Sequence, residues 1–484
     1  MTKSRIFTAS AWSAADVIVR QGIQFAIVVA LARLVAPEDF GVVAILAFFT
    51  SVASVIVDGG MSTALIQRQD INHVDESTAF WLNVGLGFTF AVLILLVADY
   101  LPLIFDIAEL SELAVLAALT VFLSSLGSVH TALLTKQLNF RTQLVAGILA
   151  TLCTGSVSII MAVKGFGVWA LSAQILGMAS LNTTFLWAFN KWRPQVKFSA
   201  ASARKLFGFG GFVLTANLVD TIYTRAYSVL IGRYIGTSEL GFYARADHTH
   251  QLPLNFLTSV FGRVALPIFS EAAGESRRLL RGMKTAVRGM MLVNLPCMFG
   301  LAALAEPVIL TIYGDLWSPA VGPFRILCIG AAFWPMQVIN IYSLMAQGGA
   351  RTVLLLEIPK KIIGVALLIA GLQHGIIGVA WSYTIFSVIS IFINCYFNGI
   401  RLGYGARSQL SDIWPTFILA TVMAVLVFLG EGIVALPDPA RLGILAVSGA
   451  AFFLMTAWAF RLDAFLDGVT LFKRASDNTS TTAV

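Results

Sequence analysis

Charged side chains are scarce in this chain. Only 12% of its 484 residues are Asp, Glu, Lys or Arg, while 58% are hydrophobic. An ordinary soluble domain carries about 25% charged residues, and the mean hydropathy here is +0.85. The composition therefore excludes a soluble globular protein and predicts an integral membrane protein. In a membrane protein the positions of the charges, which indicate the topology, matter more than the net charge of +7. No nucleic-acid partner is therefore expected.

Cysteine and histidine, the usual metal ligands, are also rare. The chain has four cysteines without paired spacing, all inside apolar runs, and five histidines. This pattern predicts neither a disulfide framework nor a metal centre. The stretch from Asp247 to His250 holds two histidines and an acid, but its place between apolar runs favours a solvated outer loop. No phosphate-binding GxxxxGK[ST] loop occurs, so we expect neither ATP nor another cofactor, and no catalytic residue.

Long apolar runs, in contrast, fill most of the chain. About twenty residues are needed to cross the hydrocarbon core as a helix. The sequence predicts an all-α polytopic protein with about fourteen such spans. The expected spans are 10–31, 40–58, 79–99, 112–134, 144–163, 168–189, 208–232, 252–270, 289–311, 323–346, 355–373, 376–397, 413–433 and 441–460.

Lysine and arginine are distributed unequally between the two sets of loops. They gather at the N-terminus and in loops after even-numbered spans, for example between Ser276 and Arg288, while the odd-numbered loops hold few, such as Arg33 and Lys164. Cytoplasmic loops carry this excess. The sequence therefore predicts that both termini are cytoplasmic.

A short pattern occurs twice, 200 residues apart. ARLVAPEDFGVVA begins at Ala32 and GRYIGTSELGFYA at Gly232, and both carry an arginine, an acid and a glycine at the same spacing. Each copy follows the first span of a set of six. We therefore expect a parallel duplication, with six-helix bundles at 1–200 and 201–400 around a central cavity. Residues 401–484 are expected to add two helices and a tail.

An ordered series of motifs resembles the O-antigen and exopolysaccharide repeat-unit flippases (Wzx-type polysaccharide transporters). That group belongs to the superfamily of multidrug, oligosaccharidyl-lipid and polysaccharide exporters. The motifs are, in order, RLVAPEDFGVVAI, DGGMSTALIQR, FWLN, ALLTKQLNFR, IGTSELGFYARA, LPLNFL with RVALPIFSEA, and GIIGVAWSY.

The resemblance implies transport of an undecaprenyl-pyrophosphate-linked sugar unit across a bacterial inner membrane, by alternating access. The expected partners are this lipid-linked oligosaccharide, membrane lipid, and a polysaccharide polymerase with export proteins. A cation-coupled exporter of drugs or metabolites on the same fold is the alternative. A membrane-embedded polymerase, ligase or acyltransferase is disfavoured, because no long outer loop is expected.

Charges inside the expected spans are the candidates for a site, since an Arg or Asp at a helix centre costs about 2.5–3.5 kcal/mol on insertion scales. Asp58 and Arg325 lie nearer the ends of their spans. The central charges are Asp16, Arg20, Asp220, Arg225 and Arg263.

The three arginines are the candidates for substrate binding. A guanidinium stays charged and donates paired hydrogen bonds to phosphate oxygens, so Arg20, Arg225 and Arg263 suit a pyrophosphate. Asp16 and Arg20 are four residues apart and can instead form a structural pair. Asp220 and Arg225 lie about 140° apart around a helix, which hinders mutual pairing.

The carboxylates are candidates for ion coupling. A partly buried Asp can exchange a proton or hold Na⁺, which makes Asp16, Asp58 and Asp220 the candidates for coupling export to an ion gradient. Asp58 precedes two glycines, so a role in a local turn is at least as well supported as a role in ion coupling.

Thiol labelling tests the predicted topology. In a background without the four native cysteines, a cysteine beside Asp106 should react with a membrane-impermeant reagent added outside the cell. A cysteine beside Lys197 should react only after permeabilisation, because that loop is expected to be cytoplasmic. The reverse pattern would refute the orientation.

Overall fold

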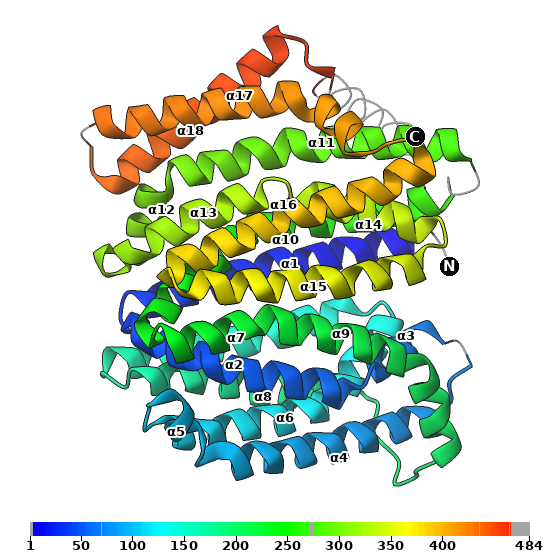
Figure 1. Cartoon of the computed structure of the whole chain (residues 1–484). Coiled ribbons are helices and arrows are strands. Elements are labelled where there is room, and N and C mark those ends of the chain that lie inside the picture. The colour runs from blue at the N-terminus through cyan, green and yellow to red at the C-terminus, as the bar shows by residue number, and fades with distance from the viewer. Residues whose placement is uncertain (1–2, 69, 272–274, 435, 464, 466–484) are drawn as a thin grey trace. The chain divides into compact units, whose positions relative to one another are not determined.

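The computed structural model describes residues 3–68, 70–271, 275–434, 436–463 and 465 (Figure 1). Every regular element among these residues is a helix, which confirms the all-α prediction. The chain divides into two compact units, Met1–Gly241 and Phe242–Val484.

The first unit consists of the nine helices α1 to α9, which differ in length, and the start of α10. Their bounds are α1 Lys3–Ala32, α2 Pro37–Asp58, α3 Met61–Gln67, α4 His73–Ala98, α5 Leu101–Phe105, α6 Leu110–Lys136, α7 Phe140–Val163, α8 Val168–Phe189 and α9 Ala200–Tyr234. Within this unit α4 packs against α6, α1 against α7, and α2 against α9.

The second unit contains most of α10 and the helices that follow. Their bounds are α10 Thr237–Glu271, α11 Ser276–Ala303, α12 Ala305–Tyr313, the 3₁₀ helix η1 Asp315–Ala320, α13 Val321–Ala331, α14 Trp334–Ala346, α15 Ala350–Leu372, α16 Gly375–Leu402, α17 Ala406–Ile433 and α18 Asp438–Ala459. Here α11 packs against α17 and α15 against α16, and both pairs run side by side in Figure 1.

Many of these helices can cross a membrane. In the described part of the chain, nine are long and apolar enough, and α9 would make ten if its two segments, which meet at a 60° bend after Gly208, form one span. This establishes a multi-pass membrane protein. The number fourteen stays a prediction, because α1, α8, α10 and α15 are not among the helices that meet this test in the described part of the chain.

The repeated pattern forms a helix-to-helix turn, as its residues suggest. Pro37 is the first residue of α2, and Glu38 and Asp39 lie in its first turn, where negative charge interacts favourably with the helix dipole. In the second copy Gly236 separates α9 from α10, and Glu239 lies in the first turn of α10.

The two copies of the pattern also contact each other, and they do so reciprocally. A Cβ atom at Gly41 would overlap the carbonyl oxygen of Thr237, and a Cβ atom at Gly241 would overlap the carbonyl oxygen of Pro37. Thr237 and Pro37 occupy equivalent positions 200 residues apart. Each glycine therefore lets the other copy's backbone approach, as in a self-complementary contact between related halves.

One expectation about the outer loops is wrong. Asp247 to His250 lie inside the continuous helix α10, and the side chain of His250 is fully buried. Thr249 bonds to the Tyr313 hydroxyl at 2.8 Å. Because one face of this stretch packs inside the second unit, its polar residues do not form a solvated loop.

The boundaries at 200 and 400 stay a prediction of the sequence repeat. Helix α9 opens the expected second bundle, yet it packs on α2, α3 and α4 and belongs to the first unit. Most of the expected C-terminal tail, residues 466–484, lies outside the described residues.

Substitution of the two reciprocal glycines tests this contact. Gly41→Ala and Gly241→Ala should each lower stability by about 1–3 kcal/mol, because the added methyl meets backbone that cannot turn aside. Thermal unfolding of the purified protein measures the effect. Gly85→Ala is the control, since a Cβ there meets no atom within 4 Å. Equal stability of all three variants would contradict a required close approach.

Candidate functional site

Arg20 lies on α1 with an exposed side chain. Its aliphatic stem rests against α7, where a Cβ atom at Gly147 would lie 3.0 Å from Arg20 Cδ. Twelve residues separate Arg20 from the end of α1, which corresponds to about 18 Å along the axis. The guanidinium is therefore far from the helix end, and its Nε and Nη1 also lie near α7, at 3.8 and 3.9 Å from that Cβ position.

Asp220 and Arg225 lie on α9, and both side chains are exposed. Arg225 forms no ion pair with any described residue, so Asp220 and Arg225 do not neutralise each other. This agrees with their angular separation. On the same helix Tyr223 and the buried Tyr227 approach hydroxyl to hydroxyl at 3.3 Å. Helix α9 thus exposes a carboxylate and a guanidinium.

Asp58 has a local role. It is the last residue of α2, which Gly59 terminates in the left-handed conformation. The carboxylate accepts a hydrogen bond from the Ser62 hydroxyl at the start of α3. This contact favours a role for Asp58 in the turn between α2 and α3, and ion coupling at this residue stays a prediction.

Two further candidates cannot be placed. Arg263 is in α10 and Asp16 is in α1, but the structure does not describe the side chains of these two residues. The pairing of Asp16 with Arg20 is therefore untested.

A charged cluster that is not among the internal charges named from the sequence lies within α15. Lys360 is ten residues inside this helix, and only 2% of its side chain is exposed. Its ammonium group donates to the Glu357 carboxylate and, at 3.2 Å, to Asn394 Oδ1 of α16. Asn394 Nδ2 is buried without a hydrogen-bond partner in the described part. The spacing Glu357–Lys360 was the available signal, because residues three apart share a helix face.

A second polar cluster ties α9 to the segment before α4. Lys205 contacts Asp70 at 3.0 Å and Asp75 at 3.5 Å. The hydrogen bonds from Arg68 and Lys205 hold the pKa of Asp70 well below its usual range. Because the lowered pKa favours the ionised form of Asp70 in the folded state, these contacts stabilise the fold at pH values above about 4, the ordinary pKa of Asp. This stabilisation is lost as the pH falls below about 4. Because Asp70 is solvent-exposed, the effect is small.

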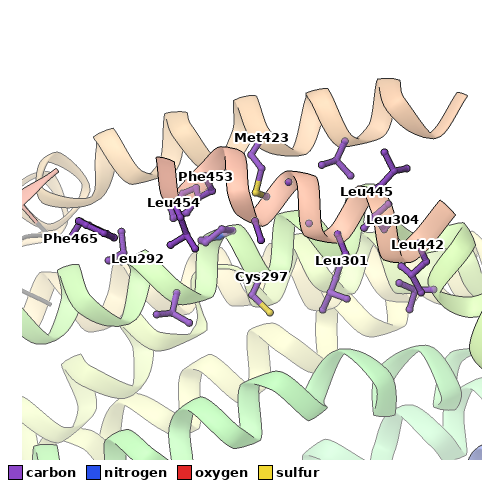
Figure 2. A pocket seen from close by; sticks show the side chains of 18 residues that line it. Leu292, Cys297, Leu301, Leu304, Met423, Leu442, Leu445, Phe453, Leu454 and Phe465 are labelled. Carbon is purple, nitrogen blue, oxygen red and sulfur yellow. The ribbon is translucent and has the colours of Figure 1, made fainter. Parts of the chain in front are cut away.

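An apolar pocket of about 460 Å³ lies between α11, α17 and α18 in the second unit. Figure 2 shows its side chains converging from these helices, with Cys297 and Leu301 on α11, Met423 on α17, and Phe453 on α18. No lining residue is charged. A pocket of this chemistry suits a hydrocarbon chain and offers nothing to a polar ligand.

The fold of this chain is also found in a solved structure. It matches the solved structure of the lipid II flippase MurJ in an inward closed conformation with a TM-score of 0.75 and 15% identity, over 93% of this chain and 99% of that one.

The chain belongs to the polysaccharide biosynthesis protein family, whose model matches residues 30–322. It is 26% identical to the teichuronic acid biosynthesis protein TuaB of Bacillus subtilis over 414 residues, 84% of this chain and 85% of the relative. It is 24% identical to the lipopolysaccharide biosynthesis protein WzxC of Escherichia coli over 427 residues, 86% of each chain. The resemblance seen in the motifs is confirmed.

Removal of Lys360 tests the charged cluster in α15. Lys360→Met should reduce the amount of folded protein in the membrane several-fold, because it leaves the Glu357 carboxylate without its partner. Breaking a buried pair costs about 3–5 kcal/mol. The double variant with Glu357→Gln should restore the amount, and Lys361→Met is the neighbouring control. Normal abundance of Lys360→Met would show that the pair does not stabilise the fold.

Proposed function

We propose that this protein is a flippase that moves a polyprenyl-pyrophosphate-linked polysaccharide repeat unit from the cytoplasmic to the outer leaflet. The family and the transporter fold support transport in polysaccharide biosynthesis. The observation that carries the substrate class is the pair of exposed arginines, Arg20 and Arg225, deep within long helices.

An exposed arginine without an ion pair at such a position needs water or an anion. A guanidinium in hydrocarbon costs several kcal/mol, so Arg225, which forms no ion pair with a described residue, is proposed to face a water-filled space, and Arg20 is the second proposed contact. An anionic group there would be favourable, and a pyrophosphate matches the donor geometry of guanidinium groups. Arg263, in α10, is the third proposed contact.

The lipid portion of such a substrate needs an apolar surface. The pocket between α11, α17 and α18 has the volume and the uncharged lining for part of a prenyl chain (Figure 2). The two C-terminal helices would then serve the lipid, while the arginines serve the headgroup.

The remaining assignments complete the proposal. The protein acts in a bacterial inner membrane with both termini in the cytoplasm, as a transporter and not as an enzyme. Asp220 and Asp16 are the proposed coupling carboxylates, for a proton or a sodium ion, with Asp58 as a third. A polysaccharide polymerase is the proposed downstream partner.

The rival function is cation-coupled export of drugs or metabolites on the same fold. Such a substrate is often an organic cation, which acids and aromatic rings bind. The exposed arginines disfavour it. A deletion strain separates the two functions, because a flippase deletion should accumulate lipid-linked repeat units that remain on the cytoplasmic face, whereas an exporter deletion should not. Normal surface polysaccharide in the deletion strain would refute the proposal.

Charge removal at the three arginines tests the site. Arg20→Gln, Arg225→Gln and Arg263→Gln should each reduce surface polysaccharide at least tenfold at normal membrane abundance. Lysine should restore part of it, because it keeps the charge but loses the paired donors. Arg407→Gln, an exposed residue in the first turn of α17, is the control.

A structural Asp16–Arg20 pair predicts another result. Arg20→Gln would then lower abundance, and the addition of Asp16→Asn would restore both abundance and export. Full export from Arg225→Gln and Arg263→Gln at normal abundance would eliminate the proposed binding site and leave the family assignment intact.

A further inference from the structure

A buried polar cluster lies where α10 meets α12 and α16 in the second unit. His250 is at its centre, and its side chain has no exposed surface. The Tyr383 ring of α16 packs on the imidazole, with ring centres 5.8 Å apart. Tyr313, the last residue of α12, bonds to the neighbouring Thr249. Three helices thus enclose a titratable side chain that the proposed substrate site does not use.

Both ring nitrogens of His250 are buried without a hydrogen-bond partner among the described residues. A neutral imidazole carries one N–H donor and one acceptor nitrogen. Burying either of them unpaired costs the free energy of its lost hydration. Native proteins satisfy nearly all such groups, so an exception calls for an explanation.

One carboxylate lies within reach of this ring. Asp247 Oδ1 is 3.8 Å from His250 Nδ1, and the two residues are three apart on one helix face. The Asp247 side chain is 36% exposed, so it connects the surface with the buried ring. Its other oxygen accepts a hydrogen bond from Gln251 Nε2 at 2.9 Å. A proton on His250 would turn this contact into an ion pair.

The groups around His250 decide whether its ring is charged. In the described part of the chain, the titratable and charged groups near it are Arg245, Asp247 and His248 on α10, Tyr313 on α12 and Tyr383 on α16. Asp247 attracts a proton to the ring, whereas Arg245 and a charged His248 repel it. Burial away from water also disfavours a charged ring, so the described conformation holds His250 neutral. A conformation that admits water would let the ring bind a proton.

A second buried histidine shows what distinguishes His250. His130 on α6 is also fully buried, and both of its nitrogens are unpaired in the described part of the chain. Its ring packs on Trp187 and Trp192, with ring centres 4.8 and 5.1 Å away. The charged group that acts on it is the cation Arg193. Because no acid there favours an imidazolium, His130 is a matched control for His250.

The cluster lies towards the outer face in the proposed orientation, since α10 and α16 both begin at that face. We propose that His250 and Asp247 form a proton-binding site that couples export to the inward proton gradient. A proton from the outer water binds to the imidazole of His250, and the resulting imidazolium pairs with the Asp247 carboxylate. The proton leaves to the cytoplasmic side as the lipid-linked unit moves outward, so one proton is exchanged for one unit.

The inference rests on the proposed function, since a proton can drive export only in a transporter. It adds a site in the second unit to the carboxylates proposed from the sequence, Asp16, Asp58 and Asp220. Histidine changes its charge between about pH 5 and 8, so a modest gradient is enough to load and unload it.

An imposed pH gradient tests the coupling. The full-length protein is reconstituted into liposomes with radiolabelled undecaprenyl pyrophosphate, the membrane potential is clamped at zero, and the outside is made more acidic by about one pH unit. For one exchanged proton, the lipid should accumulate in the outer leaflet by up to about tenfold. A membrane-impermeant phosphatase measures the fraction of lipid in that leaflet. A partial loss of folded protein slows the approach to this ratio but does not change it.

Replacement of His250 should remove the accumulation. His250→Gln cannot carry the proton, so its leaflet ratio should be the same with and without the gradient. His130→Gln and His374→Gln are the controls, since His130 is buried without an acid and His374 is exposed in the turn before α16. Both should keep the ratio of the parent protein. A His250→Gln protein that still concentrates the lipid would overturn the proposal.

Asp247→Asn gives a second measurement that does not depend on the folding of His250→Gln. It keeps the shape of the side chain and removes the negative charge that favours the imidazolium. With equal pH on both sides, the midpoint of the pH–rate profile should therefore move to lower pH by about one unit. An unchanged midpoint would contradict the role of the pair.

Failure of this inference and failure of the proposed function give different results. A parent protein that moves the lipid in response to a sodium gradient, and not to pH, would refute the inference alone. A parent protein that moves no lipid under either gradient would refute the flippase function and the inference with it.

Discussion

The cost of a charge in hydrocarbon governs this structure. It explains why charges are scarce, and it requires each internal charge to be paired, hydrogen-bonded or in contact with water. Lys360 meets the requirement by pairing with Glu357 and Asn394 inside the second unit. Arg225 is exposed without an ion pair to any described residue and needs water or an anion. Arg325 is held by a backbone carbonyl and an aromatic ring, and it interacts electrostatically with Glu431. The same constraint thus separates structural charges from those available to a ligand.

A second constraint comes from the duplicated pattern. Gly41 and Gly241 each meet the backbone of the other copy, at Thr237 and Pro37. The repeat therefore does more than build two similar turns, because its glycines allow those turns to pack closely.

The second unit offers lipid an apolar surface. The pocket beside α18 is uncharged. An uncharged lining can bind only the hydrocarbon chain of a lipid, whereas a lining with a charged end can also bind the lipid headgroup. Polar recognition at Arg20 and Arg225 and lipid recognition along α11 and α17 would then be functions of different helices.

The sequence by itself determined the membrane class, the helical fold, the turn at the repeat and the family, because apolar run length, helix-ending residues and motif order are local properties. It also identified Arg20, Asp220 and Arg225 as internal charges. It placed Asp247 to His250 in a loop and did not name Lys360 as an internal charge, and only the tertiary structure showed both in packed helices. The reason is physical: whether a polar residue ends a helix or is buried within it depends on partners such as Tyr313 and Asn394, which come from distant parts of the chain. The same holds for the burial of His250 against Tyr383, because α10 and α16 are far apart in the sequence.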